Sequence, residues 1–303
     1  MDTRIILFAA GALVMAACSS NDPEVQGSAD EIRLYSEVSA LTRAYDDPTA
    51  LQNEQFIGNT EISVMVTDKA TENKVSYSLE TYRADGSGGL TPITRQYYPP
   101  SGSDVEVCAY HPAGTTNTVT VAADQQDPLD YRASDLMWAQ LESINKNTSA
   151  EGRTLHFHHL CSKILVKLVK GNGVTDAEIA AATIILTGGD GDAMRLIMGG
   201  SFNTGTGVLT ADNNVTGTIT IAENAGTATH AAVVIPQEMG GKRITVALGG
   251  GIQSYTIPDI EFEAGMRYAY TITVNKGELI VTASIQDWTT PDGWTPPTPT
   301  LKI

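Results

Sequence analysis

Residues 267–285 read RYAYTITVNKGELIVTASI, two apolar segments separated by the short polar sequence NKG. From Leu279 to Ile285 every second side chain is apolar, which is the period-2 pattern of a β-strand with one buried face. Asn and Gly between two such segments are typical of a turn. We therefore predict two β-strands at this end of the chain.

The same pattern dominates the chain after residue 30. In EIRLYSEVS (31–39), Ile32 and Leu34 alternate with polar or amphipathic neighbours. Only VTDAEIAAA (174–182) is expected to be helical. Many short strands with turn residues between them predict an all-β sandwich architecture. Further strand-like segments, separated by Gly, Pro, Asp and Asn clusters, are EISVMVT, KVSYSLETY, DVEVCAY, NTVTVA, DLMWAQL, KILVKLVK, TIILTG, MRLIMGGSF, GVLTA, GTITIA, AAVVIP, RITVALGG and IQSYTI.

The length of 303 residues is long for one domain and suits two of about 140 residues each. A polar gap, NKNTSAEG (145–152), lies almost at the midpoint. We therefore predict two β-sandwich domains in tandem, over residues 31–150 and 151–303. Residues 18–30 are polar and contain Pro and Gly, so they are expected to be a flexible tether. The Pro-rich end, WTTPDGWTPPTPTLKI, cannot pair as a central strand.

Residues 1–17 are predicted to be a signal peptide. The apolar run IILFAAGALVMAA is too short to span a bilayer, which takes about 20 apolar residues, and it follows Arg4 and ends in small residues. Met15-Ala16-Ala17-Cys18 resembles the lipobox of bacterial lipoproteins, with Met where the pattern usually has Leu. Cleavage between Ala17 and Cys18 would free the Cys18 amine and thiol for acylation, and several acyl chains give stable membrane attachment. The alternative is a plain secretory signal with a cysteine beside it.

The charge balance excludes one class of partner. The chain has 19 Lys and Arg against 35 Asp and Glu, a formal net charge of −16. Nucleic acid is not an expected partner, because phosphate contacts need clustered cations. The acidic composition suits an exported protein that must stay soluble.

Two cysteines remain besides Cys18. Cys108 and Cys161 each lie in an apolar, strand-like run, where a buried thiol behaves as a small hydrophobe. An oxidising compartment would also permit a disulfide between them. The sequence leaves both alternatives open.

One histidine cluster is a candidate metal site. On a strand, His156 and His158 point to one side and His159 to the other. Two imidazoles at this spacing bind zinc only with further ligands, and His111 and His230 are far away in sequence. The simpler interpretation is a strand with one polar face and one histidine packed beneath a loop, so no metal site is expected.

No catalytic residue and no cofactor are predicted. The chain has no G-x-S-x-G motif, and its G-x-G matches lie between strands rather than before a helix. Residues 190–192 (DGD) lack the spaced acids of a calcium loop. Among the aromatic residues, Trp288 ends a strand and is expected in the core, while Trp294 is a candidate for sugar stacking.

Several segments together resemble the fimbrillins, the Mfa-like pilus subunits of Gram-negative anaerobes. They are the lipobox at Cys18, the sequence LTRA (41–44) after the first strand, LHFHHLCSKILVKL, GSFNTGTGVLT and FEAGMRYAYTITVNKGELIVTASIQDW. Two short patterns stand within them, F-x-H-x-x-S-K (157–163) and Ile-x-x-Trp (285–288). The resemblance implies two transthyretin-like β-sandwiches, export to the outer membrane as a lipoprotein, and assembly into a fimbria at the cell surface.

The resemblance also implies a route of assembly. In the family, an Arg-specific protease removes the first strand with the lipid, and a strand of a neighbouring subunit fills the groove. Arg43, followed by Ala44, is the implied cleavage site here, with Arg33 and Arg83 as alternatives within strand-like runs. The strand removed would be EIRLYSEVS, whose apolar face is interrupted by Ser36.

The donor strand and the final role stay open at this point. ELIVTASIQDW has the alternating apolar side chains of a donor, whereas the Pro-rich end lacks several backbone donors. The expected partners are other fimbrial subunits, and the membrane through the lipid before maturation. Two other functions remain possible: an anchor or tip subunit that keeps its lipid, and a monomeric surface lipoprotein that binds a glycan or host ligand.

Overall fold

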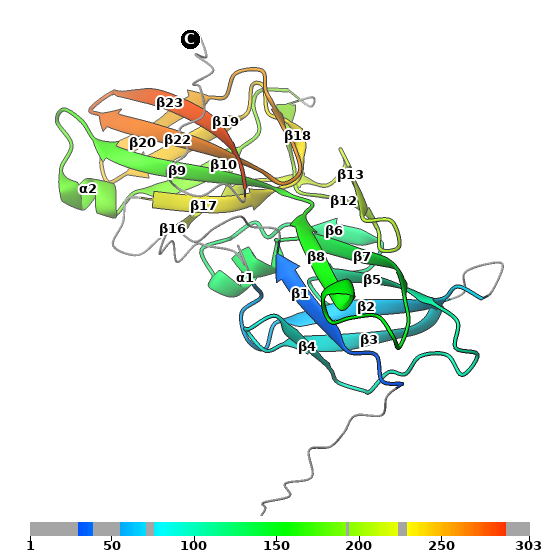
Figure 1. Cartoon of the computed structure of the whole chain (residues 1–303). Helices are drawn as coiled ribbons and strands as arrows, with labels where there is room; N and C mark the ends of the chain where they lie inside the picture. Colours follow the sequence, from blue (N-terminus) through cyan, green and yellow to red (C-terminus); the bar gives the residue numbers. More distant parts are fainter. Residues whose placement is uncertain (1–29, 39–54, 71–75, 192–193, 224–228, 289–303) are drawn as a thin grey trace, which may run out of the picture.

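A computed structural model describes residues 30–38, 55–70, 76–191, 194–223 and 229–288. They form two β-rich units that lie end to end (Figure 1). Each unit is built around its own hydrophobic core. The predicted all-β fold with two domains in tandem is confirmed.

The N-terminal unit is a seven-stranded sheet that closes on itself. All neighbouring strands are antiparallel except β1 and β8, which are parallel. Alternate side chains point inward, so that Ile62, Val64 and Val66 of β2 are fully buried. The first predicted sandwich is thus closed by hydrogen bonds into a barrel. Its strand order is β1 (Leu34–Val38), β4 (Gly89–Pro92), β3 (Ser76–Ala84), β2 (Glu61–Asp68), β5 (Val105–His111), β7 (Met137–Ile144) and β8 (Thr154–His159).

The C-terminal unit is a sandwich of a five-stranded and a four-stranded sheet around a shared core. The five-stranded sheet has the order β16 (Ala222–Glu223), β17 (Thr229–Val234), β9 (Ser162–Lys170), β22 (Met266–Asn275) and β23 (Glu278–Asp287). The four-stranded sheet has the order β15 (Ile219–Thr220), β10 (Thr183–Thr187), β19 (Arg243–Leu248) and β20 (Gly251–Thr256). Two short pairs complete it, β11 (Leu196–Ile197) with β14 (Thr216–Gly217), and β18 (Gln237–Glu238) with β21 (Glu261–Phe262).

The chain passes from one unit to the other after β8. The polar gap at 145–152 lies between β7 and β8, which are neighbours in the barrel, and leads into a short 3-10 helix, Glu151–Arg153. It is therefore a hairpin loop of the first unit, whereas the sequence led us to place the domain boundary there. Local composition indicates a loop but carries no information on which sheet the next strand joins.

One segment of the N-terminal half lies with the C-terminal unit. β6 (Thr118–Thr120) pairs with β12 (Gly199–Asn203), which also pairs with β13 (Val208–Ala211). The fully buried Gln125 exchanges two hydrogen bonds with the backbone of Val233 in β17, at 2.8 and 2.9 Å. The two units are therefore interleaved as well as consecutive.

Two short α-helices connect strands. The helix expected over 174–182 is present as α2 (Asp176–Ala180), and Thr175 and Glu178 form its capping box. A second helix, α1 (Pro128–Ala133), was not predicted from the sequence. Asp127 at its N-cap and Pro128 in its first turn are the local signal that would have indicated it.

The turn between β12 and β13 is packed on the outside of the barrel. The indole N–H of Trp138 in β7 donates to the carbonyl oxygen of Thr204 at 2.9 Å. Gly207 has a φ of +69°, and a Cβ added there would lie 2.4 Å from the Trp138 ring. Glycine is thus required at 207 both for the left-handed backbone and for the close approach to the indole.

We expect Gly207→Ala to lower the free energy of unfolding by about 2–5 kcal/mol, because the left-handed backbone costs about 1–2 kcal/mol and overpacking about 1–3 kcal/mol. Gly102→Ala is the matched control, since Gly102 has a φ of +72° but nothing within 4 Å of an added Cβ. Urea unfolding measures both losses. Equal losses in the two variants would contradict a tight contact between Gly207 and Trp138.

Candidate functional site: the strand that closes the barrel

β1 joins two neighbours that run in opposite directions (Figure 1). It is antiparallel to β4, with Leu34 opposite Leu90, and parallel to β8, with Val38 opposite Phe157. In the ring of described strands, β1 alone lies between β4 and β8. Removal of β1 would therefore open the barrel at this position, which we call the β1 slot.

The inward face of β1 is apolar. Ile32, just before the strand, and Leu34 and Val38 within it are at most 1% exposed. Glu37 is on the outward face and is exposed. The first strand therefore inserts three side chains into the barrel core.

Ser36 is the polar position on the inward face, and it is buried. Its backbone N–H donates to the carbonyl oxygen of Gly88 at 2.7 Å, and its hydroxyl donates to the same oxygen at 3.4 Å. A hydrogen-bonded hydroxyl can be buried at small cost. The serine therefore does not interrupt the buried face, although the sequence alone suggested that it would.

Two free energies of similar size decide how firmly β1 is held. Burying three aliphatic side chains is worth roughly 5–9 kcal/mol. Ordering the backbone of the seven residues 32–38, which carry these side chains, costs roughly 7–14 kcal/mol. Hydrogen bonds to β4 and β8 add roughly 0.5–1.5 kcal/mol each. Another strand of the same pattern could thus replace β1, whereas an empty slot would expose the core and two unpaired strand edges.

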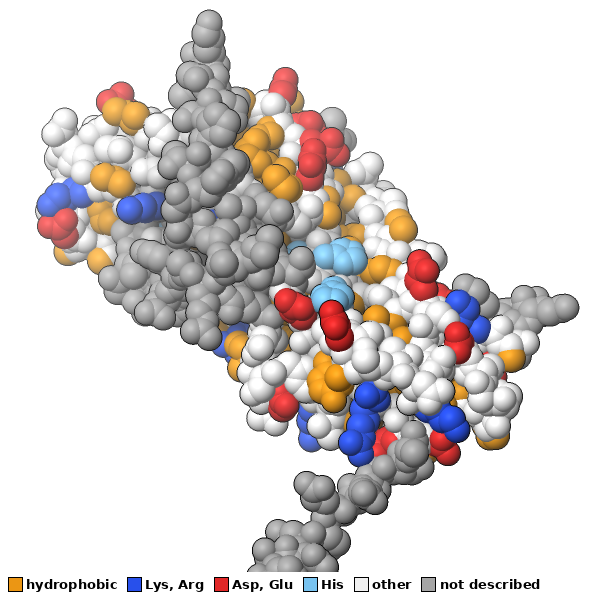
Figure 2. Space-filling view, in the orientation of Figure 1, with side chains coloured by type: hydrophobic (Ala, Val, Ile, Leu, Met, Phe, Trp, Pro, Cys, Tyr) orange, Lys and Arg blue, Asp and Glu red, His pale blue; other side chains and the backbone are white. Residues whose placement is uncertain are grey.

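Histidine and acidic side chains lie next to each other on one face of the molecule (Figure 2). His156 of β8 lies opposite Glu37 of β1, with 3.3 Å between Nδ1 and Oε2. Both side chains are more than half exposed. This contact is an ion pair only when the imidazole is protonated, and at an exposed position it then contributes only about 0–1 kcal/mol. The core side chains therefore hold β1 in place.

The other histidines are distributed over both units. His158 faces outward from β8, where partial burial lowers its pKa. His159 faces inward, as the strand pattern predicted, and both His159 and His111 are hydrogen-bonded to Asp135. His230 lies far off in β17, opposite Val166. Among the described residues, no group of three or more His, Cys, Asp or Glu side chains is placed to hold a metal ion.

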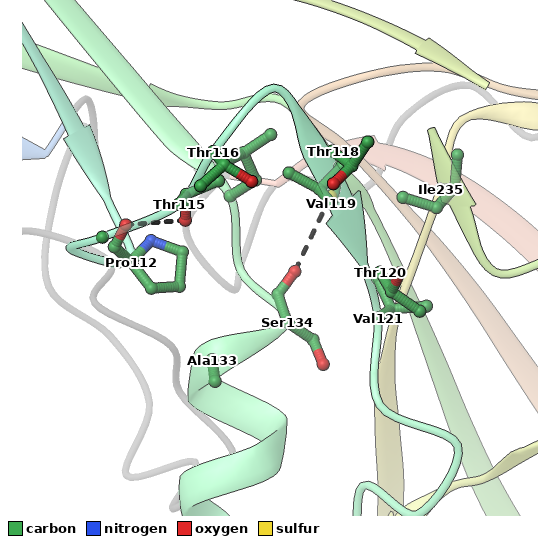
Figure 3. Close-up of a pocket in the computed structure, with 13 residues that line it drawn as sticks. Pro112, Thr115, Thr116, Thr118, Val119, Thr120, Val121, Ala133, Ser134 and Ile235 are labelled. Carbon is green, nitrogen blue, oxygen red and sulfur yellow. Dashed lines mark hydrogen bonds between the residues drawn. The ribbon is translucent and has the colours of Figure 1, made fainter. Parts of the chain in front are cut away.

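A cavity of about 220 Å³ lies where the two units meet (Figure 3). Thr115 and other hydroxyl groups line it, and the Thr115 hydroxyl donates to the carbonyl oxygen of Pro112 at 2.7 Å. Cys161 also lines the cavity, but burial raises the pKa of its thiol to about 12. Since a thiolate is the nucleophilic form of cysteine, this cavity does not supply an activated nucleophile.

Cys108 and Cys161 are both buried, and no disulfide joins them. The Cys108 thiol donates to the carbonyl oxygen of Gly205 on the β12–β13 turn, at 3.5 Å. Of the two alternatives left open by the sequence, the structure contains the buried thiols and not the disulfide.

The last described strand, β23, is already part of a sheet. It pairs with β22 along its whole length, from Glu278 opposite Asn275 to Asp287 opposite Met266. Val281 is buried and Leu279 packs against the same core. Trp288, which follows the strand, is 2% exposed, so its predicted place in the core is confirmed.

The residues predicted for lipidation and cleavage, and the candidate sugar-stacking residue, lie outside the described part of the chain. These are Ala17 and Cys18 at the lipobox, Arg43 and Ala44 at the implied cleavage site, and Trp294 in the Pro-rich end. In the described residues, no helix has the length and apolar character needed to cross a membrane.

Comparison with known proteins places these observations in a family context. A family model described as fimbrillin-like matches residues 42–288. The chain is 25% identical over 297 residues to the candidate fimbrium subunit Fim1C of Bacteroides uniformis, with 93% of each chain covered.

Two solved structures have a similar fold. A candidate cell adhesion protein from Bacteroides uniformis has a TM-score of 0.66 at 21% identity, over 87% of this chain and 100% of that one. A candidate cell adhesion protein from Bacteroides ovatus has a TM-score of 0.64 at 20% identity, over 86% of this chain and 99% of that one.

We expect the stability of the protein to depend on pH through His230. Burial lowers the pKa of His230 to about 4 from an ordinary value of 6.5. The unfolded chain therefore takes up a proton at higher pH than the folded chain, so folding loses about 3 kcal/mol between pH 6.5 and pH 4 and loses nothing above pH 6.5.

Urea unfolding across this pH range tests the expectation in His230→Gln, which removes the titrating group. His156→Gln, at an exposed position, is the control and should keep the wild-type dependence. The same pH dependence in wild type and His230→Gln would contradict the assignment.

Proposed function

The chain belongs to the fimbrillin-like family, and from this membership we propose a fimbrial subunit that is exported as a lipoprotein and polymerises by strand exchange at the β1 slot. Fimbrial and adhesion proteins of this family are structural, and their place is the cell surface. One observation carries the proposal: a single five-residue strand closes the barrel and fills its core. The proposed strand exchange follows from what the removal of β1 would expose.

Maturation begins, in this proposal, with lipid attachment at Cys18 and a cut after Arg43. Arg43 follows β1 and precedes the next described segment, which starts at residue 55, so the cut would separate β1 and its lipid from the remainder. Of the alternatives, Arg83 lies within β3 and its guanidinium is paired with Glu61 at 2.9 Å. A protease needs backbone that can leave its sheet, which counts against Arg83.

The empty slot would then accept a strand from a neighbouring subunit. The facing edges of β4 and β8 carry the N–H and C=O groups that now pair with β1. An incoming extended segment can satisfy them by β-augmentation while its alternate side chains enter the pockets of Leu34 and Val38. Strand exchange of this kind replaces one set of contacts with a similar set, so its driving force depends on the quality of the fit.

Residues 289–303 are the donor in this proposal. The competing segment, β23, would have to break ten backbone pairs with β22 and expose Val281 before it could be donated. The prolines at 296, 297 and 299 remove some ladder hydrogen bonds. That loss is smaller than the loss of a whole strand from the sandwich, so we favour the tail.

We expect Arg43→Ala to abolish maturation. The wild-type protein recovered from its native outer membrane should begin at Ala44 and run as ladders that resist detergent until boiled. The Arg43→Ala protein should keep its acylated Cys18 and remain a monomer. Intact-mass and N-terminal analysis distinguish the two, with Arg33→Ala as the control that should mature normally. A wild-type chain that begins at Cys18 and stays monomeric would instead favour a lipid-retaining anchor subunit or a lone surface lipoprotein.

Deletion of residues 289–303 should stop polymerisation and leave the fold intact, because the truncated chain keeps all of β23 and the buried Trp288. The truncated subunit should still accept a tail from an intact subunit and so terminate a growing ladder. Gel electrophoresis of unboiled samples measures ladder length, and thermal unfolding checks the fold. Ladders of normal length from the truncated protein alone would exclude the tail as donor.

A further inference from the structure

Two short patterns noted in the sequence meet where the barrel and the sandwich join. F-x-H-x-x-S-K contributes His159 at the end of β8, and Ile-x-x-Trp contributes Trp288 after β23. The imidazole and indole rings are stacked, with centroids 3.9 Å apart and planes 7° from parallel. Residues far apart in the sequence thus form one contact between the slot-bearing barrel and the end of the sandwich.

The imidazole beneath Trp288 is held in a fixed orientation. Its Nδ1–H donates to Oδ1 of Asp135 at 2.7 Å, and the Asp135 side chain is fully buried. The carbonyl oxygen of Asp135 is hydrogen-bonded to Nδ1 of His111 at 3.0 Å. Asp135 and His159 therefore form a rigid support for the indole ring. We call these two residues, together with Lys163, the Trp288 seat.

The indole is held on further sides as well. The ammonium nitrogen of Lys163, at the start of β9, lies 5.8 Å from the ring centroid, within the range of a cation–π interaction. The backbone N–H of Trp288 donates to the carbonyl oxygen of Gly265 at 2.8 Å. The backbone N–H of Gly265 in turn donates to the carbonyl oxygen of Cys161 at 2.9 Å. Trp288 is thus tied to β8, to β9 and to the start of β22.

This position matters because β23 is an edge strand. Among the described strands, β23 is hydrogen-bonded to β22 alone. A pull on the chain beyond residue 288 would first reach the pair Asp287–Met266 and could then break the following pairs one at a time. Trp288 directly follows Asp287, so a force on the tail reaches Trp288 before it reaches the Asp287–Met266 pair.

We propose that Trp288 is the anchor at which the retained fold ends and the donated segment begins. The inference rests on the proposed function, since it assigns the donor to residues 289–303. With the indole in its seat, strain on the tail is passed to the core of the junction, and β23 stays in its own sheet. Without the indole, β23 would open from its C-terminal end and follow the tail.

Hydrogen exchange in Trp288→Ala and Trp288→Phe tests the anchor. In the folded Trp288→Ala monomer, the amides of β23 should exchange about tenfold faster or more, while those of β2 and β3 in the barrel keep their rates. Trp288→Phe retains a ring that can stack on His159, so its β23 rates should stay near those of wild type. Trp138→Ala is the matched control at a tryptophan outside the seat, and it should leave β23 protected.

The result that overturns the inference is unchanged β23 exchange in Trp288→Ala, or an equal increase over the whole chain in both Trp288 variants. The same measurement on assembled ladders separates this inference from the proposed function. If Trp288→Ala forms ladders in which the β23 amides stay fully protected, the anchor role of Trp288 is rejected, while the proposed strand exchange is retained. Absence of ladders from matured wild-type protein would remove the proposed function, and the assignment of the donated segment with it.

Discussion

The architecture depends on one strand that must satisfy two neighbours at once. β1 is antiparallel to β4 and parallel to β8, and together with the preceding Ile32 it brings three aliphatic side chains into the barrel core. Closure removes both strand edges from solvent. Closure of the barrel therefore depends on a strand of only five residues, near the start of the described chain. A strand with those properties is both necessary for the closed barrel and small enough to be exchanged.

Much of the strand content could be predicted from period-2 alternation, and segments such as ELIVTASI and EISVMVT lie where that pattern indicated. Pairing could not be predicted in the same way. The parallel contact between Val38 and Phe157 joins residues far apart in the sequence, and nothing local encodes it. The gap at 145–152 misled for the same reason, because a hairpin loop and a domain linker have similar composition.

The candidate site followed from the sequence only in outline. The buried face of β1 was expected, but Ser36 counted against it until its hydroxyl was found bonded to Gly88. Alternation indicated that His159 points away from His156 and His158. It could not indicate that Asp135 would orient the imidazole and that Trp288 would stack on it, since those partners come from other parts of the fold. Which side chains contact His159 is determined by the tertiary structure and not by the local sequence.

The interleaving of the two units has a consequence for any filament they build. β6 and Gln125 belong to the N-terminal half in sequence but bond to the C-terminal sandwich, and the β12–β13 turn reaches back to Trp138 on the barrel. Bending the subunit at its middle would break these bonds together. Each subunit should therefore behave as a stiff rod segment. In a filament built by the proposed strand exchange, the bending flexibility would lie at the joints, where a single strand would pass from one subunit to the next.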